Sequence, residues 1–160
     1  STVSSLGDMA TQLKAMSEQL AANRLLSSGA LIGRSVLSAG NVGELTADRP
    51  LDGVVRLTEP ADGVTVTVRN AVGQIMESFE LGPSNAGDYP FSWDGALPQG
   101  AKALPGRYQV TVQVARNNKS SAEAALLYTP VMSVSNNKGE ATLNLQTGAS
   151  VALSQVTNLR

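Results

Sequence analysis

The sequence reads Phe91-Ser92-Trp93-Asp94-Gly95 and, shortly afterwards, Leu104-Pro105-Gly106-Arg107-Tyr108. Asp-Gly and Pro-Gly are turn dipeptides, because glycine accepts positive φ and proline presets φ near −65°. The residues that follow alternate, with apolar side chains on one face of an extended chain: Tyr108, Val110, Val112 and Val114. This pattern is typical of a half-buried strand. Trp93 ends the preceding strand and is expected to cover its apolar face. The segment therefore predicts two strands of an antiparallel β-sandwich.

The composition excludes several classes of site. The chain has 160 residues, no cysteine and no histidine. This composition excludes disulfides, thiol nucleophiles, the usual zinc sites and catalytic arrangements that use histidine as the base. No apolar run is long enough to span a bilayer, and a net charge of −1 gives no reason to expect nucleic acid as a partner. We therefore expect no enzyme activity, no cofactor and no metal.

Residues 5–28 are predicted to form one helix, with Ser5 and Asp8 as a weak capping pattern and Gly29 as the stop. Its apolar residues are spaced alternately by three and four, as at the a and d positions of a coiled coil: Leu6, Met9, Leu13, Met16 and Leu20. These five residues are called the seam. Asn23 breaks the pattern at the next d position. Because the stripe is narrow, we prefer self-association of the helix over docking of the helix onto the chain's own domain. Docking onto the chain's own domain stays open as the alternative.

From residue 31 onward the periodicity is that of strands. The predicted strands are 31–37, 54–58, 64–69, 74–81, 89–93, 108–114, 122–129, 131–134, 141–146 and 150–153. Strand 74–81 carries Glu77 on the face of Ile75 and Phe79, which predicts an edge strand or a β-bulge. The acidic residues Asp48, Asp52, Glu59 and Asp62 are interpreted as turn residues and not as a catalytic or calcium site.

Several segments, taken in order, resemble the FlgD family of flagellar hook-capping proteins. The Trp-Asp-Gly and Leu-Pro-Gly-x-Tyr elements are similar to the two elements that flank a loop in the Ig-like domain of that family. Residues 31–36 resemble the segment that opens its small Tudor-like barrel, 68–75 resemble an early hairpin, and 143–156 resemble the closing hairpin and tail. The likeness covers residues 5–160. It implies that an export segment precedes Ser1, so that this chain is a fragment.

The resemblance also implies the fold: a mainly β protein with an N-terminal helix and a small Tudor-like barrel interrupted by an inserted fibronectin III or Ig-like sandwich. The expected divisions are 1–29 for the oligomerisation helix, 30–50 with 126–160 for the barrel, and 51–125 for the sandwich. The aromatic residues support this division, because only Tyr128 lies outside 51–125. The expected core signature of the sandwich is Phe91, Trp93, Asp94, Gly95, Pro105, Gly106 and Tyr108.

By the same resemblance, the chain is expected to be a non-catalytic scaffold exported by the flagellar secretion system. It would sit at the distal end of the growing hook, outside the cell, as a five-fold ring. Its partners would be other copies of itself and hook protein subunits, with no nucleic acid and no membrane insertion. The alternative is a secreted or surface Ig-like adhesin or carbohydrate-binding module with a coiled-coil stalk. That alternative requires an exposed Trp93 that can stack on a sugar.

Overall fold

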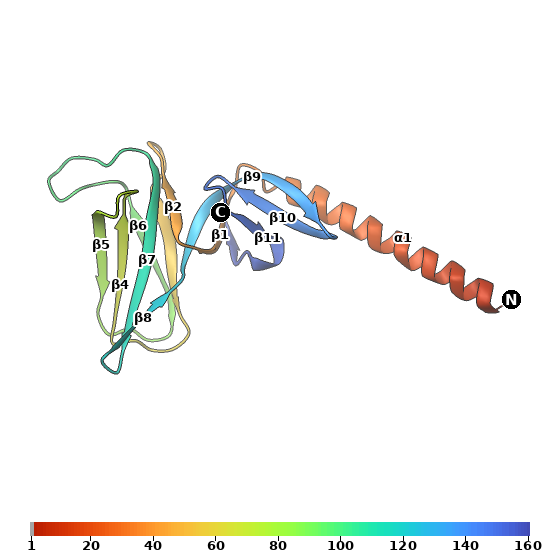
Figure 1. Cartoon of the computed structure of the whole chain (residues 1–160), viewed down its shortest axis with the longest axis horizontal. Helices are drawn as coiled ribbons and strands as arrows, with labels where there is room; N and C mark the ends of the chain where they lie inside the picture. Colours follow the sequence, from red (N-terminus) through yellow and green to blue (C-terminus); the bar gives the residue numbers. More distant parts are fainter. Residues whose placement is uncertain (1) are drawn as a thin grey trace. The chain divides into compact units, whose positions relative to one another are not determined.

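A computed structural model describes residues 2–160, with only the backbone described at Leu25. The fold is mainly β with one N-terminal helix (Figure 1), as the sequence predicts. The chain forms two compact units, and it passes between them more than once. Unit 1 comprises 1–34 and 130–155, and unit 2 comprises 35–129 and 156–160.

Helix α1 spans Thr2–Gly29. It begins three residues before the predicted start, so the Ser5 and Asp8 pair lies inside the first turns and does not cap the helix. Alanine, leucine, glutamine, lysine and methionine dominate its length, and these residues have high intrinsic helix propensity. Near its end the Ser28 hydroxyl donates to the carbonyl of Arg24 at 2.7 Å. The predicted stop at Gly29 is confirmed.

The strands of unit 1 come from the second half of the chain. They are β9 (Ala125–Asn137, of which 130–137 lie in this unit), β10 (Glu140–Leu145) and β11 (Ser150–Ala152), followed by the short helix η1 (Leu153–Gln155). Lys138 and Gly139 both have positive φ in the tight turn between β9 and β10. Val131, Leu143 and Leu145 are buried. The end of α1 contacts β10, so these strands support the base of the helix.

Unit 2 is built from two antiparallel sheets. The first has the order β2 (Val42–Leu45), β7 (Gly106–Arg116), β4 (Gly63–Arg69) and β5 (Ile75–Leu81), with β8 (Lys119–Glu123) also paired to β7. The second pairs β3 (Leu51–Leu57) with β6 (Gly87–Trp93) and with residues 126–127 of β9. In the same sheet, β1 (Ser35–Gly40) lies next to β9 and pairs on its other side with β12 (Asn158–Leu159).

Alternating side chains fill the core between the two sheets. The valines of β4 and the apolar residues of β7 that the alternation predicts to be buried are buried: Val64, Val66, Val68, Tyr108, Val110, Val112 and Val114. They pack with Leu51, Leu57 and Trp93 from the other sheet. The period-2 pattern therefore identifies both the strands and their inward faces.

Strand β5 pairs only with β4 and lies at the edge of its sheet. The register shifts where Val68 pairs with Glu77 but Arg69 pairs with Ile75, so Met76 is the extra residue. Both the edge position and the bulge are confirmed. The interruption of the alternation at Glu77 is thus a sign of irregular pairing.

The units differ from the expected divisions at residues 50 and 126. Strand β2 lies within the expected barrel segment 30–50 but pairs along its length with β7, and Leu45 joins the core of unit 2. Residues 156–160 likewise belong to unit 2, through β12. Short strands such as these owe their position to their pairing partners, which periodicity does not identify. The assignment of the remaining segments to a Tudor-like barrel stays a prediction.

Three local predictions need correction. Residues 30–34 form turns after α1, and the strand predicted at 31–37 begins only at Ser35. The strands predicted at 122–129 and 131–134 are largely one strand, β9, which continues through Pro130. Asp52 and Gly53 lie within β3 and not in a turn. Gly53 is needed there because a Cβ atom would lie 2.2 Å from the carbonyl oxygen of Leu126.

Candidate functional site

All five seam residues are exposed. Leu13 and Met16, at the centre of the seam, expose 64% and 62% of their area. The described side chains of residues 2–20 are all exposed, and Ser28 is the only buried one on the described part of α1. Contiguous apolar residues on an unpartnered helix face mark an interaction surface. Self-association through the seam remains a prediction, but within this chain the seam has no docking partner among the described residues.

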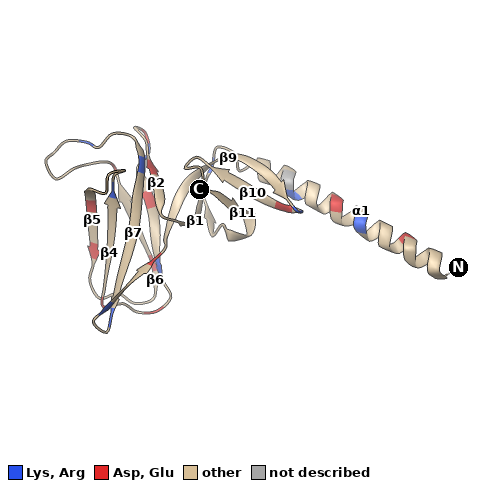
Figure 2. Ribbon diagram, viewed as in Figure 1, with Lys and Arg blue, Asp and Glu red and all other residues tan. Residues whose placement is uncertain are grey.

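Neutral side chains border the seam. On one side are Ala10 and Ser17, and on the other are Gln12 and Gln19. Charged residues are sparse along α1 (Figure 2), and Lys14 and Glu18 lie away from the seam by their helical position. Contacts made by such a surface would depend on apolar burial and not on ion pairs, since interhelical ion pairs need charged flanking positions.

At its C-terminal end the seam line meets a hollow of about 300 Å³. The helix contributes Leu20, Asn23 and Ser27, which continue the a and d positions. It also contributes Arg24 and Ser28. Leu31, just after the helix, and Leu153 of η1 form the apolar walls on the other side. All of these residues belong to unit 1. The base of α1 therefore has apolar walls beside polar seam positions.

Trp93 lies in the buried core of unit 2. The Trp93 side chain is 2% exposed, and its indole N–H donates to the carbonyl of Ala96 at 2.9 Å. Asp94 holds the turn, because its carboxylate accepts from the backbone N–H of Ala96 at 3.0 Å. Gly95 has φ of 91°, a conformation that glycine adopts without strain. A tryptophan buried in this way offers no face to a sugar, which removes the observation that the adhesin alternative requires.

The second half of the signature closes the same region. Gly106 has positive φ after the exposed Pro105, and Tyr108 then turns inward. The Tyr108 ring meets Trp93 edge-on, with ring centroids 5.0 Å apart and an interplanar angle of 81°. Its hydroxyl donates to the carbonyl of Leu104. Burial raises the pKa of the Tyr108 phenol above its usual value.

Phe91, the remaining member of the signature, is half-buried and lies 6.2 Å from Phe79 between ring centroids. Phe79 and Phe91 both pack against the buried core of unit 2. The aromatic residues of the predicted signature thus surround one structural core. Their packing stabilises the fold of unit 2.

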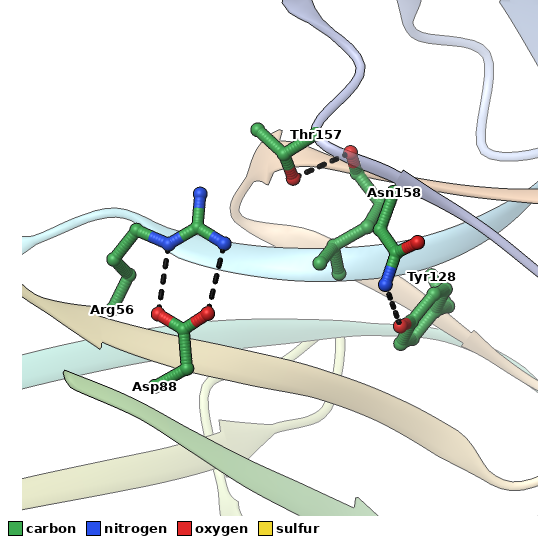
Figure 3. Close-up of polar contacts among 6 residues, drawn as sticks. Arg56, Asp88, Tyr128, Thr157 and Asn158 are labelled. Carbon is green, nitrogen blue, oxygen red and sulfur yellow. Dashed lines mark hydrogen bonds and ion pairs between the residues drawn. The ribbon is translucent and has the colours of Figure 1, made fainter.

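The sequence did not identify a polar cluster around β12. Arg160 forms an ion pair with Asp52 and stacks over the Tyr128 ring at 4.1 Å. The Asn158 amide donates to the Tyr128 hydroxyl at 3.3 Å, and the Thr157 hydroxyl donates to the carbonyl of Leu37 (Figure 3). These contacts hold 156–160 on unit 2. The residues of this cluster are far apart in the sequence, so no local sequence pattern predicts the cluster.

The other predicted acidic residues do not join Asp52 in one site. The Asp62 carboxylate accepts from the backbone N–H of Asn117 at 2.8 Å, which supports a turn. Elsewhere on unit 2, Arg56 makes a two-pronged ion pair with Asp88, with distances of 2.8 and 2.9 Å (Figure 3). The hydrogen bond from Arg56 lowers the pKa of Asp88. Both groups are exposed, so the pair is a surface contact across strands β3 and β6.

Among residues 2–160, no helix combines the length and the hydropathy that crossing a bilayer requires.

Comparisons with known proteins agree with this architecture. Residues 40–118 match the family model of the FlgD Ig-like domain. The basal-body rod modification protein FlgD of Escherichia coli K12 is 28% identical over 98% of this chain and 71% of its own length. A crystal structure of FlgD from Pseudomonas aeruginosa has a TM-score of 0.72 and 29% identity, covering 81% of this chain and 98% of its own.

A second crystal structure, of FlgD from Xanthomonas campestris, has a TM-score of 0.69 and 26% identity, covering 86% of this chain and 99% of its own. Its description concerns hook capping, which it calls essential for flagellar assembly. One family thus accounts for the match to the sandwich, for the near-complete sequence alignment and for both structural neighbours. Residues 40–118 are thus an Ig-like domain of the FlgD family, and nearly the whole chain is similar to FlgD proteins.

Proposed function

We propose that this chain is a hook-capping scaffold required for assembly of the bacterial flagellar hook. The observation that carries the proposal is the extent of the likeness to FlgD, which spans 98% of the chain and includes α1 as well as both units. A match confined to the Ig-like domain would support the fold alone. The role is structural, and hook protein subunits are the proposed partners.

The finer parts of the proposal concern assembly and location. The scaffold works at the distal end of the growing hook, outside the cell, after export by the flagellar secretion system. Copies associate through the seam of α1 into a five-fold ring. The exposure of the seam supports this, because each apolar side chain buried between copies contributes roughly 1.5–3 kcal/mol.

Substitution of two seam residues tests the proposal. Leu13→Asp with Met16→Lys places charges at the centre of the seam and is expected to abolish self-association. Both residues are exposed, so the free energy of unfolding of the monomer should change by no more than about 0.5 kcal/mol each. The matched control, Lys14→Asp with Glu18→Lys, introduces the same two side chains on the polar face of the helix.

The assay is complementation in a bacterium that lacks its own hook-capping gene. The natural sequence and the control should restore hooks and motility, and the seam variant should not. The sequences are expressed with the N-terminal region of a full-length relative. Normal hooks assembled by the seam variant would contradict the role of the seam. Failure of the natural sequence and the control, with secretion demonstrated, would contradict the capping function itself.

A further inference from the structure

Two loops at one end of unit 2 hold apolar side chains in water. One is the turn 70–74 between β4 and β5, and the other is the connection 94–105 between β6 and β7 (Figure 1). Val72 is 78% exposed and Leu104 is 80% exposed, and Ile75 at the start of β5 is exposed as well. None of these three side chains belongs to the core of unit 2. Apolar side chains gathered at one end of a domain mark an interaction surface.

The turn 70–74 is fixed by the side chain of its first residue. Asn70 Oδ1 accepts from the backbone N–H of Val72 at 3.1 Å and from that of Gln74 at 2.9 Å. The Asn70 amide also donates to the Gln74 side chain at 2.8 Å. Gly73 supplies the positive φ that the turn requires. Val72 is therefore presented to solvent by a turn whose backbone is already ordered.

The connection 94–105 is tied down near both of its ends. The backbone N–H of Ala103 donates to the carbonyl of Gly95 at 2.7 Å. The carbonyl of Leu104 accepts from the Tyr108 hydroxyl, which holds the Leu104 backbone while its side chain stays in water. Groups that are ordered before binding lose little entropy when a partner covers them. Both loops are thus prepared for contact with another molecule.

A hollow of about 440 Å³ lies between the two loops. Its lining is apolar at Met76, Leu97 and Ala103, and it is cationic at Lys102 and Arg107. Among the described residues that line it, none carries a carboxylate. Complementary charge selects the partner of such a surface. The hollow therefore suits an apolar group that is flanked by negative charge.

The adjoining edge of β5 is closed to a partner strand. The β-bulge at Met76 interrupts the regular pairing of this strand. The Glu77 carboxylate accepts from the backbone N–H of Ser78 at 2.9 Å. Bulges and charged side chains at a sheet edge prevent the addition of a further strand. Binding at this end of unit 2 therefore depends on side chains and not on strand addition.

We propose that this end of unit 2 docks a segment of a hook protein subunit in which apolar side chains are flanked by carboxylates. The proposal rests on the function proposed above and names the surface that contacts this partner. The apolar side chains of the segment enter the hollow and cover Val72 and Leu104. Its carboxylates lie near Lys102 and Arg107, which speeds association and disfavours cationic segments.

Binding of purified hook protein monomers from the same bacterium to the immobilised chain tests this surface. The variant Val72→Ser with Leu104→Ser removes two of its exposed apolar side chains. The matched control, Val3→Ser with Leu26→Ser, changes the same residue types on α1, where these side chains are 79% and 76% exposed. Circular dichroism confirms that both variants are folded.

A second pair of variants tests the charge. Lys102→Glu reverses one charge at the hollow. Lys119→Glu makes the same change at the start of β8, beside the other end of β7. Lys102→Glu should slow association with the hook protein, and Lys119→Glu should not. Tighter binding by Lys102→Glu would show a cationic segment and would overturn the inference.

The dissociation constant of the variant with both Val72→Ser and Leu104→Ser should rise about tenfold or more, because two buried apolar contacts are lost. That of its control should stay within about twofold of the natural chain, as for substitutions outside an interface. Equal binding by the natural chain and this variant would overturn the inference and leave the hook-capping function intact. Absence of binding by the natural chain would overturn the inference together with the hook protein as a partner.

Discussion

Replacement of Trp93 by alanine should strongly destabilise unit 2. The side chain is 2% exposed, contacts Tyr108 edge-on and donates one hydrogen bond to Ala96. Removing a large buried aromatic side chain costs about 3–5 kcal/mol, because the cavity does not refill. The aromatic pair accounts for about 0.5–1.5 kcal/mol of that cost. A domain of this size is stable by about 5–15 kcal/mol, so the loss is a large fraction of the total.

Trp93→Phe separates the contributions to this cost. Phenylalanine keeps a ring in the core but cannot donate to Ala96. The lost hydrogen bond costs about 0.5–1.5 kcal/mol, and the smaller volume adds to this cost. The phenylalanine variant should therefore lie between the natural chain and the alanine variant.

Urea denaturation followed by far-ultraviolet circular dichroism measures both variants. Trp93 is the only tryptophan, so intrinsic tryptophan fluorescence disappears with the substitution and cannot serve for the comparison. With a denaturant slope of about 2 kcal/mol per molar, the alanine variant should lose roughly 1.5–2.5 M from the midpoint of the unit 2 transition. An unchanged midpoint would refute the assignment of Trp93 to the core. An unchanged midpoint together with loss of binding to a saccharide array would support the adhesin alternative.

Two further predictions concern unit 2. The Tyr108 phenol has a raised pKa in the folded state. Its contribution to the free energy of unfolding is therefore complete below about pH 10 and falls as the pH rises further. Tyr108→Phe should cost about 0.5–1.5 kcal/mol near neutral pH, and this cost should shrink above pH 10; a cost independent of pH in urea denaturation would contradict the prediction. Gly53→Ala places a Cβ atom against the Leu126 carbonyl and should cost about 1–3 kcal/mol or more. Gly63→Ala meets nothing closer than 3.8 Å and is the control, so equal thermal midpoints for these two variants would contradict the steric argument.

The elements that could be predicted from the sequence have a local signal. Val64, Val66 and Val68 alternate within one strand, and the seam of α1 repeats at helical spacing, so burial pattern and element type follow from neighbours in the sequence. The turn at Asp94-Gly95 depends only on residues next to it. These features were correctly placed to within a few residues.

The elements that could not be predicted depend on distant partners. Strands β2 and β12 are four and two residues long and owe their place to β7 and β1. Asp52-Gly53 has the composition of a turn, but pairing with β6 and β9 on its two sides makes it part of a strand. For the candidate site, the seam could be proposed from spacing alone. The hollow at its base could not, because Leu153 is far from the helix in the sequence.

The way in which the chain is divided constrains the order in which it folds. Residues 156–160 complete unit 2, although the residues immediately before them, 130–155, belong to unit 1. A ribosome or an export channel that releases the chain from its N-terminus delivers β12 and Arg160 after strands β1–β11. Until then the β1 partner of β12 is missing and Asp52 lacks its ion pair with Arg160. Unit 2 therefore cannot be completed before all of residues 130–155, which belong to unit 1, have been released.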